Sequence, residues 1–133
     1  RIIDQAHNEH LREELKASVI PYSVEAAWRL ERWDDLEEAL VEIEKVTPMC
    51  HSPNYDEDNI FRIQLGKLIH YFHQRDKHKF YLNSLQAKLE ITSALSSLTM
   101  ESYSLCYPLL CQLHIIRELE ICFPVSFSSV DAS

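Results

Sequence analysis

Residues 33–46 read WDDLEEALVEIEKV, and this stretch decides the fold class. Its apolar side chains recur at i, i+3, i+4, i+7 and i+10, which is the spacing of one stripe along an α-helix. The stripe consists of Leu36, Ala39, Leu40, Ile43 and Val46. The acidic residues fall mostly on the opposite side, where an amphipathic helix faces water. They are Glu37, Glu38, Glu42 and Glu44.

Both ends of this helix carry recognisable signals. Asp34 and Glu37 have the spacing of a capping box, so we expect the helix to begin at Trp33 or Asp34. The step Thr47-Pro48 predicts its end, because proline disfavours the helical conformation in the residue before it.

Helical periodicity also precedes this stretch. Leu11, Leu15 and Val19 are spaced by four and predict a first helix that ends near Ser18. Pro21 then predicts a break, followed by a second helix over residues 22–31.

Three more helices are predicted after a polar loop at residues 48–58. The first covers residues 59–74, and Asp76 is suited to cap the next, which carries Phe80, Leu82, Leu85 and Leu89. The last covers residues 100–122, with Pro108 either in its first turns or at a kink. The Ser-rich residues 123–133 are predicted to be a loose tail, unless their apolar side chains dock on a neighbour.

About six helices in series, without strand alternation, predict an all-α fold. We expect helical hairpins stacked as an α-solenoid of degenerate tetratricopeptide-like repeats, because no clean 34-residue repeat is found. The predicted packing positions are Trp28, Trp33, Leu36, Leu40, Phe61, Leu65, Leu68, Leu85 and Leu113. Trp28 and Trp33 are expected to wedge two helices together, and a peptide groove lined by them is the alternative.

The composition excludes several classes of function. Hydrophobic residues make up 46% of the 133 residues, which is typical of a globular chain. The only glycine, Gly66, rules out Gly-rich phosphate loops. A net charge of −8 argues against direct contact with nucleic acid. The uncharged run from Ser102 to Ile116 is shorter than the about 20 residues of a membrane span, so no membrane contact is expected.

No constellation predicts catalysis, a cofactor or a metal site. His70 and His73 are three residues apart and could face one metal ion, but no Cys, Asp or Glu completes the set on that helix. The kinase loops and the serine-hydrolase elbow are missing. The thiols of Cys106, Cys111 and Cys122 are expected to be buried, reduced and inert, as in an intracellular protein.

Several motifs resemble one family. Residues 25–30, EAAWRL, followed by Trp33-Asp34, resemble a signature of the FAT region of phosphatidylinositol-3-kinase-related protein kinases. Residues 65–68, 75–76, 80–81 and 84–85 look like the matching helix pair of the ATR type. Segments 102–103, 107, 113–114 and 118–120 do so as well. The resemblance covers about residues 20–122, although the acidic loop is longer than that pattern. Glu101-Ser102 and Tyr107-Pro108 are also similar to the ATM branch, the second choice.

This resemblance implies a fragment of a FAT helical-repeat domain over residues 1–122. It implies a non-catalytic scaffold within a serine/threonine kinase of the DNA-damage and replication-stress checkpoint. ATP and magnesium would belong to the parent's kinase domain. The implied partners are the rest of that chain, an interacting subunit and a second copy, in the nucleus.

Two other hypotheses come from different classes. A stand-alone tetratricopeptide-like adaptor would repeat Asn, Lys and Arg on the first helix of each pair, where bulky apolar residues stand instead. A small metalloenzyme would use His70 and His73.

Overall fold

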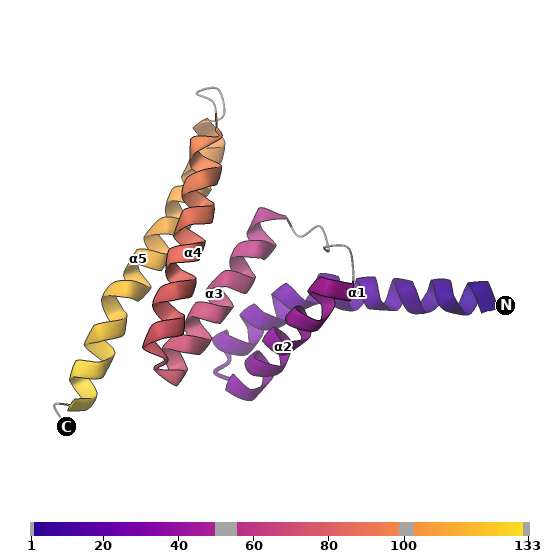
Figure 1. Cartoon of the computed structure of the whole chain (residues 1–133), viewed down its shortest axis with the longest axis horizontal. Helices are drawn as coiled ribbons and strands as arrows, with labels where there is room; N and C mark the ends of the chain where they lie inside the picture. The colour runs from indigo at the N-terminus through magenta and orange to yellow at the C-terminus, as the bar shows by residue number, and fades with distance from the viewer. Residues whose placement is uncertain (1, 50–55, 99–102, 132–133) are drawn as a thin grey trace. The chain divides into compact units, whose positions relative to one another are not determined.

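A computed structural model of the chain describes residues 2–49, 56–98 and 103–131, which form five α-helices (Figure 1). The helices are α1 (Ile2–Arg29), α2 (Trp33–Met49), α3 (Glu57–Gln74), α4 (Lys77–Ser96) and α5 (Tyr103–Asp131). No strand occurs in these ranges, so the predicted all-α class is confirmed. The chain divides into two compact units, residues 1–70 (unit 1) and 71–133 (unit 2), and the boundary falls within α3.

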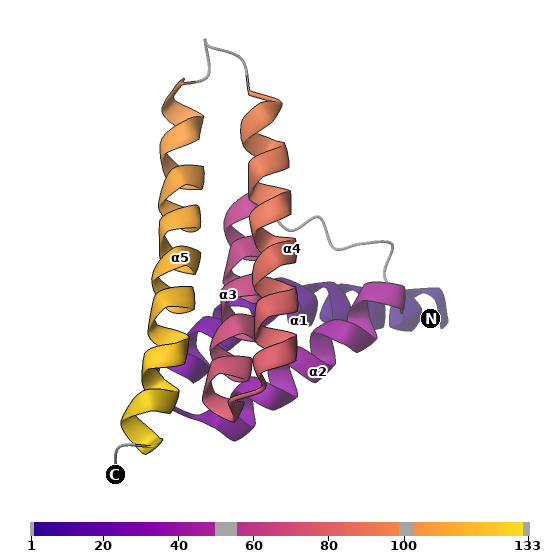
Figure 2. The ribbon, with the colours of Figure 1, turned by 60° about the vertical axis from the view of Figure 1, so that its left-hand side comes forward.

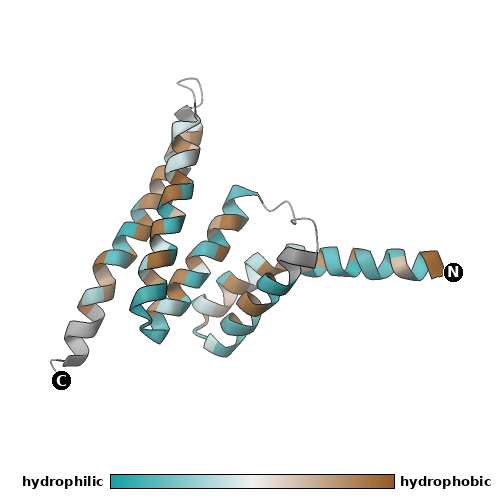
Figure 3. Ribbon diagram, viewed as in Figure 1, coloured by the Kyte–Doolittle hydropathy of each residue, from teal (hydrophilic) through white to brown (hydrophobic). Residues whose placement is uncertain are grey.

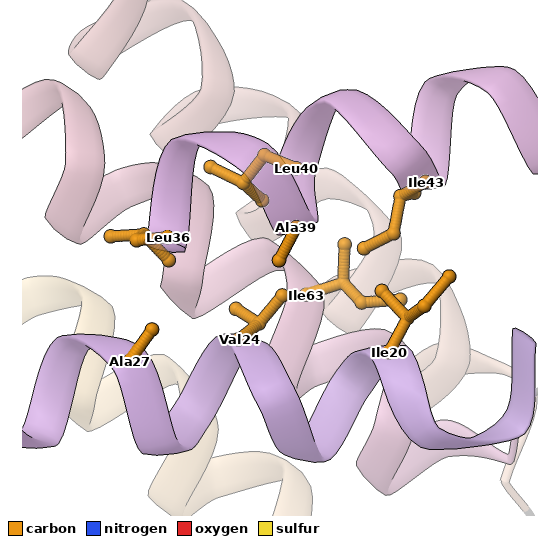
Figure 4. Packing of buried hydrophobic residues seen from close by; sticks show 8 residues of the cluster. All are labelled: Ile20, Val24, Ala27, Leu36, Ala39, Leu40, Ile43 and Ile63. Carbon is orange, nitrogen blue, oxygen red and sulfur yellow. The ribbon is translucent and has the colours of Figure 1, made fainter. Parts of the chain in front are cut away.

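Unit 1 is built on a hairpin of α1 and α2, which lie side by side in antiparallel directions (Figures 1 and 2). Three helices contribute to its buried cluster, which Figure 4 shows from close by. Its members are Ile20, Val24 and Ala27 from α1, Leu36, Ala39, Leu40 and Ile43 from α2, and Ile63 from α3. The α2 side of the cluster is the stripe expected from residues 33–46, apart from Val46, whose side chain lies outside the described set.

A Schellman motif closes the turn from α1 to α2. The Arg32 N–H donates to the Ala27 carbonyl oxygen at 2.8 Å, and the Glu31 N–H donates to the Trp28 carbonyl oxygen at 3.2 Å. Glu31 has φ 57°, in the left-handed region that glycine usually occupies at this position. This conformation costs a non-glycine residue about 1–2 kcal/mol.

The same motif closes the turn from α3 to α4. The Asp76 N–H donates to the Tyr71 carbonyl oxygen at 3.1 Å, and the Arg75 N–H donates to the Phe72 carbonyl oxygen at 3.2 Å. Arg75 has φ 59°. The Asp76 carboxylate then accepts from the Lys79 N–H at 3.1 Å, which confirms the predicted cap of α4.

Unit 2 contains a second antiparallel hairpin, formed by α4 and α5 (Figures 1 and 2). Phe80 and Phe123 stack with ring centroids 4.3 Å apart, and both are fully buried. The ring of Phe72 meets Phe123 edge-on at 5.3 Å. Such aromatic pairs add about 0.5–1.5 kcal/mol beyond their area burial, so this cluster anchors one end of the hairpin.

Pro21 does not break the chain as predicted, because it lies inside the continuous helix α1. The separate helices expected before and after it are one element. Pro21 is itself fully buried, and its ring contributes apolar contact that offsets the N–H it cannot donate. The first half of α1, residues 2–16, is exposed and mostly hydrophilic (Figure 3).

The C-terminal residues also differ from the prediction of a loose tail. Helix α5 continues through Asp131, and Phe123 is buried against unit 2 rather than free. The predicted start of this helix at Met100 lies outside the described residues. Pro108 lies within the first two turns of α5, one of the two predicted positions.

Smaller boundary differences concern α2 and α3. Helix α2 begins at Trp33 as predicted, but Asp34 lies within its first turn rather than at its cap. Helix α2 extends to Met49 and α3 begins at Glu57, so both ends of the predicted 48–58 loop are helical. Residues 50–55 of that loop lie outside the described part of the chain.

Candidate functional site

Helix α3 meets the hairpin of unit 1 closely at Gly66. A Cβ atom at this position would overlap the Val24 Cγ1 atom and would lie 3.8 Å from Leu36 Cδ1. Val24 and Leu36 are both fully buried, so neither side chain has free space to move into. The single glycine of the chain therefore allows α3 to approach α1 closely at this point.

A polar contact beside Gly66 joins the same two helices. The Arg62 Nε atom donates to Glu25 Oε2 at 3.0 Å, and Arg62 Nη1 donates to Asn59 Oδ1 at 2.9 Å. The Arg62 guanidinium also lies 5.0 Å from the centroid of the Tyr22 ring. Both side chains are only partly exposed, so salt screens this ion pair less than a fully exposed one.

The two tryptophans lie at the turn of the hairpin. Trp28 and Trp33 are partly buried and pack against the unit 1 cluster, as expected of residues that wedge α1 and α2 together. The Arg29 guanidinium lies 5.3 Å from the centroid of the Trp28 ring, and Arg29 Nη2 donates to Glu25 Oε1 at 2.9 Å. The motif that carried the family resemblance is therefore a packing motif.

Unit 2 contains a second polar contact between helices, at Glu120 of α5. Its Oε1 atom accepts from Ser84 Oγ and from Lys88 Nζ, each at 2.8 Å. Burial alone would raise the pKa of Glu120. The hydrogen bonds from Lys88 and Ser84, together with the positive charges of Lys88 and Arg117, lower that pKa below its ordinary value of 4.5. This contact joins α4 and α5 in a defined register.

The predicted packing positions differ in burial. Leu36, Leu40 and Leu68 are buried, and Trp28, Trp33, Phe61, Leu65 and Leu113 are half-buried. Leu85 is 52% exposed, which contradicts its assignment as a packing position within this chain. The buried residues of α4 are instead Phe80, Ser84, Ala87 and Ile91, on the opposite side of the helix.

Sequence reasoning missed Gly66 and both polar contacts between helices. A lone glycine inside a helical pattern is a usable signal of close backbone approach. The ion pair of Arg62 with Glu25 and the bond of Ser84 to Glu120 join residues 37 and 36 positions apart. No local pattern reports such pairs.

The chemical alternatives gain no support from the geometry. His70 is half-buried and His73 is exposed on α3, and no group of three or more potential metal ligands comes together among the described residues. Cys111 and Cys122 are exposed on α5, so the prediction that they are buried is wrong. In the part of the chain that the structure describes, no helix combines the length and apolarity needed to cross a bilayer.

Comparison with known proteins identifies the family. The family model of the FAT domain matches residues 20–131. A serine/threonine-protein kinase ATR from Oryza sativa subsp. indica is 36% identical over 98 residues, which is 73% of this chain. A protein of the same name from Arabidopsis thaliana is 29% identical over 107 residues, or 80% of the chain.

The chain spans about 4% of the length of these curated relatives. No solved structure is significantly similar to it. The matched residues contain the hairpin turn with both tryptophans, the Gly66 contact and the Glu120 contact described above. The chain therefore belongs to the FAT domain family, and it is a FAT region of the ATR type.

Proposed function

We propose that this chain is a non-catalytic scaffold segment of an ATR-like serine/threonine protein kinase that acts in the DNA-damage and replication-stress checkpoint. Its helical units support the kinase domain of the same polypeptide and its assembly contacts. The ATP and magnesium sites belong to that kinase domain, and the parent works in the nucleus with an interacting subunit and a second copy of itself.

The observation that carries this proposal is the packing of the family motif. Trp28 and Trp33 contact the buried cluster of unit 1 from both sides of one turn. A motif used in this way acts through rigidity, because side chains held in a packed core transmit displacement with little compression. Support of a distant kinase domain requires this property.

The test uses the full-length kinase and a matched pair of substitutions on α2. Leu36 is fully buried, and Leu36→Ala removes contacts worth roughly 2–5 kcal/mol. Val41 lies on the same helix and is 44% exposed, so Val41→Ala is the control. We expect Leu36→Ala to lower DNA-damage-stimulated phosphorylation of Ser-Gln or Thr-Gln substrates and recovery of the interacting subunit, whereas Val41→Ala retains both.

Full activity of the Leu36→Ala enzyme, with unit 1 shown to be destabilised, would refute the scaffold role. A prior measurement separates this role from a stand-alone adaptor. An antibody against residues 48–58 detects a native polypeptide far larger than 15.6 kDa if the segment belongs to a kinase, and a band of that size if it is an adaptor.

A further inference from the structure

The turn from α3 to α4 gathers positive charge in an otherwise acidic chain. It carries three exposed cations and one carboxylate, a net charge of +2, whereas the whole chain carries −8. The cations are Arg75, Lys77 and Lys79, which we call the basic turn, and the carboxylate is Asp76. Salt screens charges over about 8 Å at physiological ionic strength, so a ligand at this turn meets the local positive charge rather than the net negative charge of the chain.

Two of these cations stand where a helix favours acids. The N-terminus of a helix is the positive end of its dipole, so Asp and Glu stabilise the first turn, whereas Lys and Arg oppose it. Helices α2 and α3 follow this rule, with two acids each in their first turns. Helix α4 has no acid in its first turn, and Lys77 and Lys79 lie there instead. The stability of α4 therefore does not explain these two lysines.

The basic turn is also poorly neutralised by the chain itself. At the turn from α1 to α2, each of the two arginines lies within 2.9 Å of a carboxylate oxygen. In the basic turn, Lys79 Nζ lies 4.0 Å from Asp76 Oδ2, and the other oxygen of that carboxylate already accepts from the Lys79 N–H. The side chain of Lys77 forms no ion pair or hydrogen bond with any residue in the described part of the chain.

Packing holds the backbone of the basic turn in place. Phe72 and Phe80 flank it and meet edge to face, with ring centroids 5.9 Å apart. The Schellman hydrogen bonds of this turn, described above, fix the backbone between the two rings. A ligand therefore has to order only the cationic side chains, which lowers the entropic cost of binding.

The arrangement of the cations selects the kind of anion. Lys77 and Lys79 are two residues apart, about 200° around the axis of α4, so their ammonium groups do not converge on one phosphate. A nucleic acid is bound through about 6–10 phosphates, and this turn offers only three cations. An extended peptide with several carboxylates can place one of them beside each cation.

We propose that the basic turn binds a short, extended, Asp- and Glu-rich segment of a partner protein. The carboxylates of that segment lie beside Arg75, Lys77 and Lys79. This role goes beyond the proposed scaffold function, because it uses exposed side chains that the packing of the chain does not require. The contact is exposed and electrostatic, so its affinity falls as the salt concentration rises.

The experiment measures binding of a fluorescein-labelled polyglutamate peptide to the full-length parent polypeptide by fluorescence anisotropy. The test variant is Lys77→Glu with Lys79→Glu. The dipole of α4 favours acids at these positions, so a loss of folding does not explain a loss of binding. The control variant, Lys16→Glu with Lys45→Glu, makes the same change in net charge at two exposed positions of unit 1. Labelled single-stranded DNA and a peptide with one phosphoserine represent the other two classes of anion.

We expect the polyglutamate peptide to bind the wild type, to bind the test variant about tenfold more weakly, and to bind the control variant within about twofold of the wild type. Absence of binding to the wild type, or equal affinity for the wild type and the test variant, would overturn the proposal. Equal losses in both variants would do so as well, because they would report net charge alone. DNA or phosphopeptide binding that is lost only in the test variant, with polyglutamate binding unchanged, would assign the turn to that anion instead. These measurements do not use kinase activity, so the Leu36→Ala comparison decides the scaffold role separately.

Discussion

Gly66→Ala tests whether the contact of α3 with α1 is as close as the structure shows. The added methyl group overlaps Val24 Cγ1 in the present geometry. Val24 is fully buried, and a β-branched residue in a helix has one strongly preferred rotamer. The overlap is therefore relieved only by moving α3 away from α1, which also strains the contact of Arg62 with Glu25.

Two opposing terms set the magnitude. Overpacking a filled core costs about 1–3 kcal/mol. Replacing glycine by alanine inside a helix gains about 1 kcal/mol, because alanine has the better helix propensity. We therefore expect Gly66→Ala to lower the free energy of unfolding by up to about 2 kcal/mol.

Urea unfolding of the chain, followed by far-ultraviolet circular dichroism, measures this change, and a double-mutant cycle with Val24→Ala identifies its cause. Removal of the Val24 methyl groups makes room for the new Cβ atom, so the double variant should be more stable than the sum of the single changes by about 1–3 kcal/mol. If Gly66→Ala instead stabilises by about 1 kcal/mol and adds simply to Val24→Ala, the close approach is refuted.

Three further predictions concern the same contacts. Phe123→Ala should lower the free energy of unfolding by about 3–5 kcal/mol, whereas Val125→Ala, at a 62% exposed position, should change it little. Equal effects of the two substitutions would support the prediction that residues 123–133 are a loose tail. Glu120→Gln should destabilise by about 1–3 kcal/mol at neutral pH. Because the pKa of Glu120 is lowered on folding, its stabilisation is present above pH 4.5 and is lost as the pH falls through the folded-state pKa, so wild type and variant should converge in acid denaturation. Glu31→Gly should stabilise the chain by about 0.5–1 kcal/mol, because glycine adopts the left-handed backbone conformation of this position without strain. The control Glu38→Gly, within α2, should destabilise the chain by about 1 kcal/mol. Thermal melts in which Glu38→Gly is the more stable variant would contradict the turn geometry.

Local sequence patterns predicted helices correctly where the residues that form the pattern lie close together in the chain. The stripe from Leu36 to Ile43 and the cap at Asp76 depend on residues within one or two turns of each other, so the sequence contains all the information they need. The family motif at Trp28 and Trp33 was also placed correctly, because its two residues flank a single short turn.

Predictions failed where a distant contact decides the local structure. Pro21 reads as a helix break, but burial of its ring in unit 1 holds α1 continuous. Phe123 stands in a polar, Ser-rich segment, and its stacking on Phe80, far away in sequence, extends α5. The prediction that Leu85 is a packing position was wrong for a different reason. Leu85 follows the helical spacing of the apolar residues, but that spacing does not show which side of α4 is buried within the chain.

The error at Leu85 separates two kinds of apolar position in this segment. Leu36 finds its neighbours within the chain, so its contribution belongs to the stability of unit 1. Leu82, Leu85 and Leu89 share one side of α4 and are each more than half exposed, so they contribute little to the core of unit 2. Phe80, Ala87 and Ile91 on the other side of α4 are buried, so the same helix carries apolar residues of both kinds. Helical spacing therefore predicts which residues share one side of a helix, and only the contacts of the folded chain show which side is buried.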